Sequence, residues 1–145
     1  MSSLDLALAR MHASIGATIN RLGAVAERVA VLAAPVIEAH VQQQYAYGRD
    51  PYGMPWKPLR PATLARGRRP PPLTDTGLMR NTTTVRPRIG RPGIVIRLPQ
   101  PGVFHQLGTR HMVARPVLPS RGVPRMWADA LRRASLQAMR EAGRP

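Results

Sequence analysis

Seven prolines between residues 46 and 74 constrain the fold of this chain more than any other feature. Each proline fixes φ and removes a backbone donor, so this stretch can form neither a long helix nor a central strand. Yet four of the six aromatic residues lie at its start, namely Tyr45, Tyr47, Tyr52 and Trp56. A loop of this length in a compact domain tends to be functional. We therefore predict an extended Pro-rich arm over residues 46–74 that a partner orders.

Residues 1–45 have the pattern of a long helix. Large apolar residues recur at steps of three and four from Leu4 to Val36, which is the spacing of one helical stripe. Because a proline ring clashes with the preceding turn, we expect Pro35 to end the first piece near residue 33 and a second piece to reach residue 45. A helix this long often packs against a neighbouring subunit as well as its own core. The alternative is an ordinary helical hairpin within one chain.

Residues 75–119 read as a β-rich region with a second loop. We predict a hairpin of strands at 82–89 and 93–98, with Pro87 placing the first strand at an edge. "ATLARG" and "DTGLMR" are short helical turns, and "PGVFHQLGT" is a further strand or turn. The expected buried face of the hairpin comprises Val85, Ile89, Ile94, Ile96 and Leu98.

We predict a C-terminal helix over residues 120–143, with Pro124 at its first position and an apolar stripe running from Trp127 to Ala138. The fold class is therefore α+β, in one domain over residues 1–145: a long N-terminal helix, a Pro-rich loop, a small antiparallel sheet and a C-terminal helix.

The net charge of +15 is unevenly distributed. Residues 1–44 carry three arginines and three acids, whereas residues 45–145 carry 19 basic and four acidic residues. Such an imbalance suggests a polyanion or an acidic protein surface as partner, while 21 arginines against one lysine equally fit a codon bias and a solvated basic surface. The candidate contacts are Arg66, Arg68, Arg69, Arg86, Arg88 and Arg91.

The sequence offers little for catalysis. It has no cysteine, Asp50 and Asp75 have the positions of turn and cap residues, and His105 and His111 lack an evident third metal ligand. We therefore expect no enzyme activity, no cofactor and no metal. No apolar run long enough for a membrane span and no signal peptide are evident, so we expect no membrane association.

Three stretches in order resemble a known family. "DPYGMPWKPLRPATLA" resembles the G-x-x-W-x-P-L-x-x-x-T stretch of phage virion morphogenesis (tail-completion, neck) proteins, the family that includes the Mu G protein. "PPLTDTGLMRNTT" is similar to its L-x-x-T-G-x-L-x-x-S stretch, with threonine where serine is usual. "GVFHQLGTRHMVARPVLP" is similar to its H-Q-x-G-T … A-R-P-F-L stretch, with Val117 in place of the aromatic residue.

The resemblance implies a structural, non-catalytic protein that forms a ring, commonly of six subunits, at the head–tail junction of a virion assembled in the host cytoplasm. Its partners would be copies of itself, adjacent neck, adaptor and tail-tube proteins, and unspecifically the genomic DNA in the lumen. We expect the subunit interface to contain Tyr52, Trp56, Pro58, Leu59, Leu73, Gly77, Leu78, Phe104, His105, Gln106, Arg115 and Pro116.

Two alternatives remain open at this point. Trp56 could fill the core of its own chain instead of anchoring the arm on a neighbouring subunit. The protein could also be a basic, sequence-independent nucleic-acid-binding protein of a mobile element, because the arginines could neutralise phosphates. The sequence does not distinguish a tail terminator from a completion protein or a head-side stopper.

Overall fold

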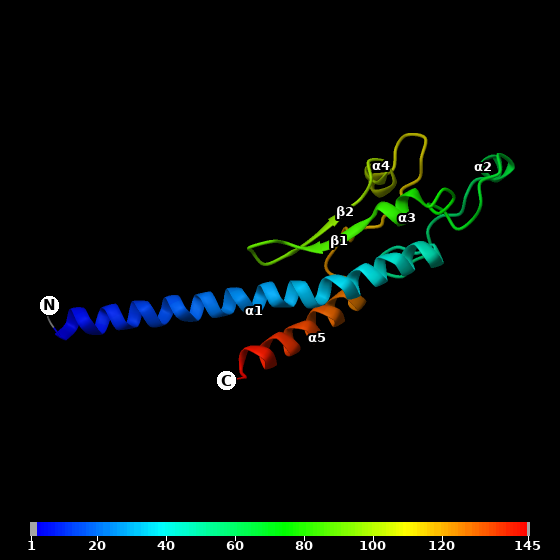
Figure 1. Cartoon of the computed structure of the whole chain (residues 1–145). Helices are drawn as coiled ribbons and strands as arrows, with labels where there is room; N and C mark the ends of the chain where they lie inside the picture. Colours follow the sequence, from blue (N-terminus) through cyan, green and yellow to red (C-terminus); the bar gives the residue numbers. More distant parts are fainter. Residues whose placement is uncertain (1–2, 145) are drawn as a thin grey trace.

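Two helices and a hairpin organise the chain. The computed structural model describes residues 3–144. Helix α1 (Ser3–Tyr47) lies between helix α5 (Arg125–Ala142) and the hairpin of β1 (Thr84–Pro87) and β2 (Ile94–Arg97) (Figure 1). The predicted α+β class is thereby confirmed. Three short helices complete the chain: α2 (Pro61–Ala65), α3 (Leu78–Thr82) and α4 (Pro101–Leu107).

Helix α1 runs without a break through Pro35, so the predicted interruption there is wrong. Pro35 lies on the exposed face of the helix, and Val31, whose carbonyl loses its partner, is also exposed. That carbonyl can therefore bond to water. On the opposite side, Ala33, Ala34 and Ile37 are buried in the core and hold the turns on both sides of the proline in helical geometry. Tertiary packing thus overrides the local helix-breaking effect of proline.

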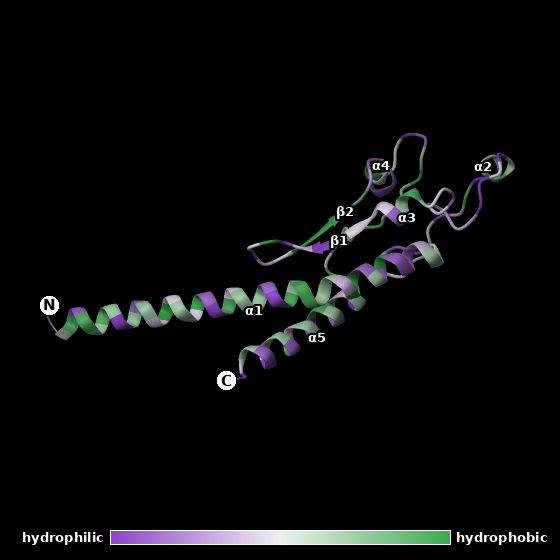
Figure 2. Ribbon diagram, in the orientation of Figure 1, coloured by the Kyte–Doolittle hydropathy of each residue, from purple (hydrophilic) through white to green (hydrophobic). Residues whose placement is uncertain are grey.

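The apolar stripe of α1 is only partly used by the chain's own core. Residues 4–22 project beyond the rest of the described molecule, and their large apolar side chains are exposed (Figures 1 and 2). The packing of α5 on α1 ends near the ion pair between Arg28 Nε and Glu141 Oε2, at 2.7 Å. Beyond that point the described chain offers α1 no neighbour.

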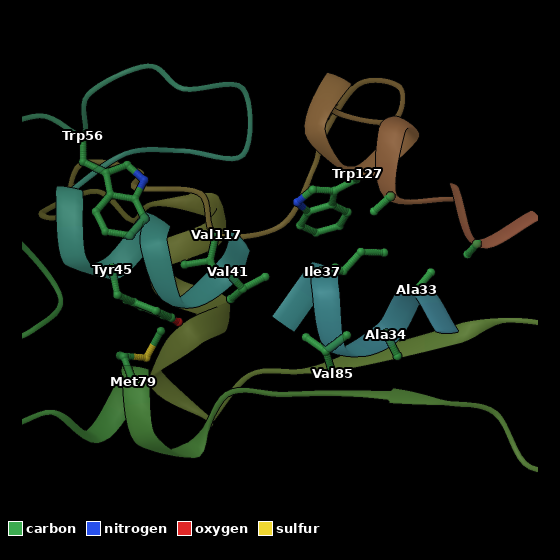
Figure 3. Close-up of a cluster of buried hydrophobic side chains, with 12 residues drawn as sticks. Ala33, Ala34, Ile37, Val41, Tyr45, Trp56, Met79, Val85, Val117 and Trp127 are labelled. Carbon is green, nitrogen blue, oxygen red and sulfur yellow. The ribbon is translucent and has the colours of Figure 1, made fainter. Parts of the chain in front are cut away.

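The core gathers where α1, α5, the hairpin and the loops meet. Ile37 of α1 lies between Trp127 of α5 and Val85 of β1, and Tyr45 lies between Trp56 and Met79 (Figure 3). The Tyr45 hydroxyl and the Thr83 hydroxyl lie 2.8 Å apart and share a hydrogen bond, so this buried polar pair is satisfied. Burial also raises the pKa of Tyr45.

The predicted hairpin is confirmed, with shorter strands than expected. Val85 pairs with Ile96 and Pro87 with Ile94 in an antiparallel register. Val85 is buried, and Ile94, Ile96 and Leu98 pack against the core as predicted. Ile89 is a correction, because it lies in the turn beyond β1 and its exposed fraction is 98%.

Residues 101–107 form helix α4, although a strand or turn was predicted there. Pro101 stands at the start, where a missing N–H costs nothing, and Gly108, with φ of +75°, ends the helix. A Cβ at Gly102 would lie 2.6 Å from that of Leu98, so only glycine lets α4 lie this close to the end of β2. This contact favours a helix despite the β-forming residues Val103 and Phe104.

Helix α5 begins at Arg125 rather than at residue 120, and Pro124 precedes the helix as its N-terminal cap residue. Its predicted stripe is confirmed at Trp127, Ala134 and Ala138, which are buried against α1. Residues 120–123 remain irregular. Among the described residues, no helix has the length and apolar character required to cross a membrane.

Candidate functional site

The three motif stretches meet in one place, and Arg115 joins two of them. Its Nε donates to the Lys57 carbonyl at 2.8 Å and its Nη2 to the Pro58 carbonyl at 3.0 Å. Its backbone N–H donates to the His105 carbonyl at 2.7 Å. Arg115 is 8% exposed, and burial lowers its pKa. One arginine therefore fixes the Pro-rich arm to the segment that follows α4.

Gln106 of α4 fastens the same segment from the other side. Its Oε1 accepts hydrogen bonds from the backbone N–H groups of Val117 at 2.9 Å and Leu118 at 2.8 Å. Its Nε2 donates to the Leu118 carbonyl at 2.8 Å. A side-chain amide is the group that can both accept and donate in this arrangement. The Gln106 side chain thus makes the hydrogen bonds to the backbone of residues 117–118 that a neighbouring β-strand would otherwise make.

Trp56 lies in the core of its own chain. The indole is 6% exposed, donates from Nε1 to the Pro116 carbonyl at 2.9 Å, and meets the Tyr45 ring edge-on at a centroid distance of 5.9 Å (Figure 3). The placement of Trp56 at a subunit interface is therefore corrected, because its surface is already covered within the chain. The aromatic residues at the start of the arm fold it back onto α1.

Tyr52 attaches the next turn of the arm to the loop before α5. Its hydroxyl accepts a hydrogen bond from the Arg121 N–H at 2.7 Å and also contacts the carbonyl oxygens of Arg121 and Gly122. The Arg121 guanidinium lies over the Tyr52 ring at 5.1 Å. Asp50 holds the turn itself, because its Oδ1 accepts from the N–H groups of Tyr52 and Met54. Asp50 is thus a turn residue, as predicted.

An open basin of about 510 Å³ lies beside these contacts, and we call it the arm basin. The arm, α3, α4 and the loop after α4 surround it. Its wall combines apolar side chains with basic ones, and the Arg68 guanidinium is paired with the Asp75 carboxylate. The residues that line it and were predicted as interface residues are Leu59, Leu73, Leu78, His105 and Arg115.

The other predicted interface residues do not line the arm basin. Pro58 and Phe104 are exposed, Phe104 by 52%, while Pro116 and Gly77 are half-buried. Gly77, with φ of +71°, starts α3. A Cβ there would lie 3.0 Å from the Asn81 side chain, so glycine fits both the backbone and the space.

His105 is, besides Arg115, a titratable group in the wall of the arm basin whose pKa is shifted. Burial, and secondarily the positive charge of Arg115, lower the pKa of His105. Its Nδ1 is buried without a hydrogen-bond partner among the described residues. The neutral imidazole is therefore the favoured form beside the arginine. No group of three or more metal-ligating side chains occurs in the described residues.

The predicted basic residues fall into two separate groups. Arg66, Arg68 and Arg69 lie at the exposed tip of the arm, where Arg68 and Arg69 also line the arm basin. On the hairpin, a shallow hollow of about 410 Å³ is lined by Arg86, Arg88, Arg91 and Arg97. Arg86 donates to Glu38 Oε2 of α1 at 2.8 Å, so one of these charges is already partly balanced.

Comparisons with protein-family models, with curated proteins and with solved structures found no match to this chain.

Some residues that build the site escaped the sequence interpretation. Tyr45 was counted among the arm's aromatic residues, whereas it lies in the last turn of α1 and supports Trp56. Gln44 is 7% exposed and donates to the Val117 carbonyl at 2.9 Å, and nothing in a polar run such as "VQQQY" singles it out. A second series at steps of three and four, through Ala30, Ala34 and Ile37, would have placed Val41 and Tyr45 near the core.

Proposed function

We propose that this protein is a structural subunit of a phage head–tail junction, where it forms a ring of about six copies that finishes the tail tube and joins it to the capsid connector. The observation that carries the proposal is the convergence of the three motif stretches. Arg115 and Trp56 bond the first stretch to the third, and Leu73 and Leu78 of the second stretch line the arm basin together with residues of the other two. A set of short motifs that builds one rigid unit supports a common role better than three isolated resemblances do.

The geometry suits a building block rather than an enzyme. The side chains of Arg115, Gln106 and Trp56 each bond to the backbone of another segment, so they hold segments of the chain together instead of presenting reactive groups. The wall of the arm basin combines apolar and basic side chains, which are features of a surface that receives a protein segment. In the proposed ring, its occupants are a neighbouring copy or an acidic surface of an adjacent neck ring.

Electron microscopy of purified particles and of the isolated protein tests this function. The expected result is a ring of this chain at the head-proximal end of the tail, and rings of the isolated protein. Leu78→Glu, in the wall of the arm basin, should reduce ring formation and incorporation into particles at least tenfold. Leu136→Glu on α5 is the matched control, because Leu78 and Leu136 have equal exposed fractions of 49%. Absence of the chain from every purified particle would refute the proposal.

The hairpin arginines favour a second candidate, namely sequence-independent binding of nucleic acid. Arg88, Arg91 and Arg97 line one hollow together, and a phosphate backbone fits such a surface. This function predicts an affinity for unrelated DNA duplexes that falls steeply as the salt concentration rises, without ring formation. Fluorescence anisotropy at several salt concentrations measures it. Rings that bind DNA weakly at physiological salt would instead favour the head–tail proposal.

A further inference from the structure

The first half of α1 exposes an unusually large apolar surface. Between residues 4 and 22, no other part of the described chain covers the helix, and seven large aliphatic side chains have exposed fractions of 42–68%. Apolar patches of this extent on a folded protein commonly mark an interaction site. The seven residues are Leu4, Leu6, Leu8, Met11, Ile15, Ile19 and Leu22.

Most of these side chains follow a heptad repeat. Steps of four and three residues alternate without interruption over five heptads, which is the period of a coiled coil. One polar residue, Thr18, occupies a position in the series, and its hydroxyl donates to the Ser14 carbonyl at 2.9 Å. Its polar group is therefore satisfied within the helix. We call this series the α1 seam: Leu4, Leu8, Met11, Ile15, Thr18, Leu22, Val25, Val29, Leu32 and Val36.

The exposed part of the α1 seam, from Leu4 to Leu22, is distinct from the face that the chain buries for itself, whereas Val29 and Leu32 further along the seam pack against the core. The buried face carries Ala30, Ala34 and Ile37, which lie about a third of a turn around the helix from the seam. At its far end the seam continues into a shallow groove of about 280 Å³ between α1 and α5, lined by Leu32 and Val36. Val36 remains 43% exposed there. A partner along the seam would therefore meet one continuous apolar track.

The distribution of charge along the chain indicates which partner covers the α1 seam. Residues 1–44 carry three arginines and three acids and are neutral, whereas the rest of the chain carries the whole net charge of +15. The exposed part of α1 carries only two arginines and one acid, so two copies that approach through α1 meet less electrostatic repulsion than they would through the basic remainder of the chain. The exposed part of the helix is about 30 Å long, close to three heptads. Gly16 and Gly23 weaken a solitary helix, so a partner helix is needed to keep it ordered.

We propose that the α1 seam packs against the α1 seam of a second copy of this chain and forms a coiled coil between subunits. The inference names a surface for self-association. It rests on the homo-oligomeric part of the proposed function but not on the phage assignment.

A pair of glutamate variants tests the seam. Ile15→Glu places a charge within it, and Ala13→Glu places the same charge on the opposite face of the same exposed helical turn. Sedimentation velocity over a range of concentrations should find the wild type and Ala13→Glu associated alike, with Ile15→Glu at least tenfold weaker in association. An unchanged association of Ile15→Glu, or a wild type that stays monomeric throughout, overturns the proposal. Unchanged Trp fluorescence verifies that the core remains folded.

Cross-linking supplies a second measurement, since the chain has no cysteine. Under mild oxidation Ile15→Cys should form disulfide-linked pairs, because residue 15 lies in the exposed seam and faces its counterpart when the two helices run parallel in register. Ala13→Cys should remain unlinked. Linked pairs together with absence from particles would leave the seam standing and remove the phage function. If Ile15→Glu forms normal rings on particles, the proposal for the α1 seam is refuted and the phage function stands.

Discussion

Trp56 holds the start of the Pro-rich arm against the core of its own chain, by packing on Tyr45 and by one hydrogen bond to Pro116. Trp56→Ala removes both and leaves a cavity, so we expect the free energy of unfolding to fall by about 3–5 kcal/mol. Urea denaturation measures the change. Tyr47→Ala is the control, because Tyr47 is 72% exposed and should change the stability by less than about 0.5 kcal/mol.

The contrary outcome is equally specific. If Trp56→Ala folds with wild-type stability and fails only in ring formation, the indole acts on a neighbouring subunit, as the sequence interpretation expected. The burial of Trp56 argues for the first result.

His105 makes stability depend on pH. Burial lowers the pKa of His105 in the folded state, so the unfolded chain binds more protons below its ordinary value of about 6.5. Stability should therefore fall as the pH drops from about 6.5 toward the lowered folded-state pKa, and stay level above. Urea midpoints between pH 5 and 7.5 measure this. His105→Gln should flatten the dependence, and His12→Gln, on the exposed part of α1, should leave it unchanged. An equally steep profile for His105→Gln would contradict the role.

At the scale of elements, Pro35 shows where packing outweighs propensity. Pro35→Ala restores the N–H that can bond to the Val31 carbonyl and removes the ring clash, so we expect a gain of about 1–3 kcal/mol in stability. Pro58→Ala should have the opposite sign, with a loss of about 0.4–1 kcal/mol, because a rigid residue in the arm limits the unfolded chain. Thermal unfolding of both variants measures the difference. A loss of stability in Pro35→Ala would show that the proline supports the helix.

Elements with a clear period were predictable, and those set by packing between neighbouring segments were not. The stripes of α1 and α5 and the alternation of the hairpin are local signals, and all three elements are present. Helix α4 was missed because Val103 and Phe104 favour strands locally. What decides its conformation is the close approach of Gly102 to Leu98 and the bond from the Arg115 N–H to the His105 carbonyl.

At the scale of the whole molecule, the motif residues were identifiable from the sequence but their roles were not. Arg115 and Trp56 were both assigned to a subunit interface. Their partners, Lys57, Pro58 and Pro116, lie roughly 60 residues away along the chain, and no local pattern encodes a contact at that separation. For charge, the sequence already separated the arginines of the arm from those of the hairpin, and the fold adds that Arg68 pairs with Asp75 and Arg86 with Glu38.

The unbroken course of α1 has a mechanical consequence. One end of the rod is clamped beneath the arm, and the other is free of the chain's own packing. A small tilt of the half that packs beneath the arm would therefore displace the free end by a larger distance. A force applied to the free end would act in turn on Tyr45, which packs against Trp56. In such a movement the helix would pivot where α5 leaves α1, near Arg28.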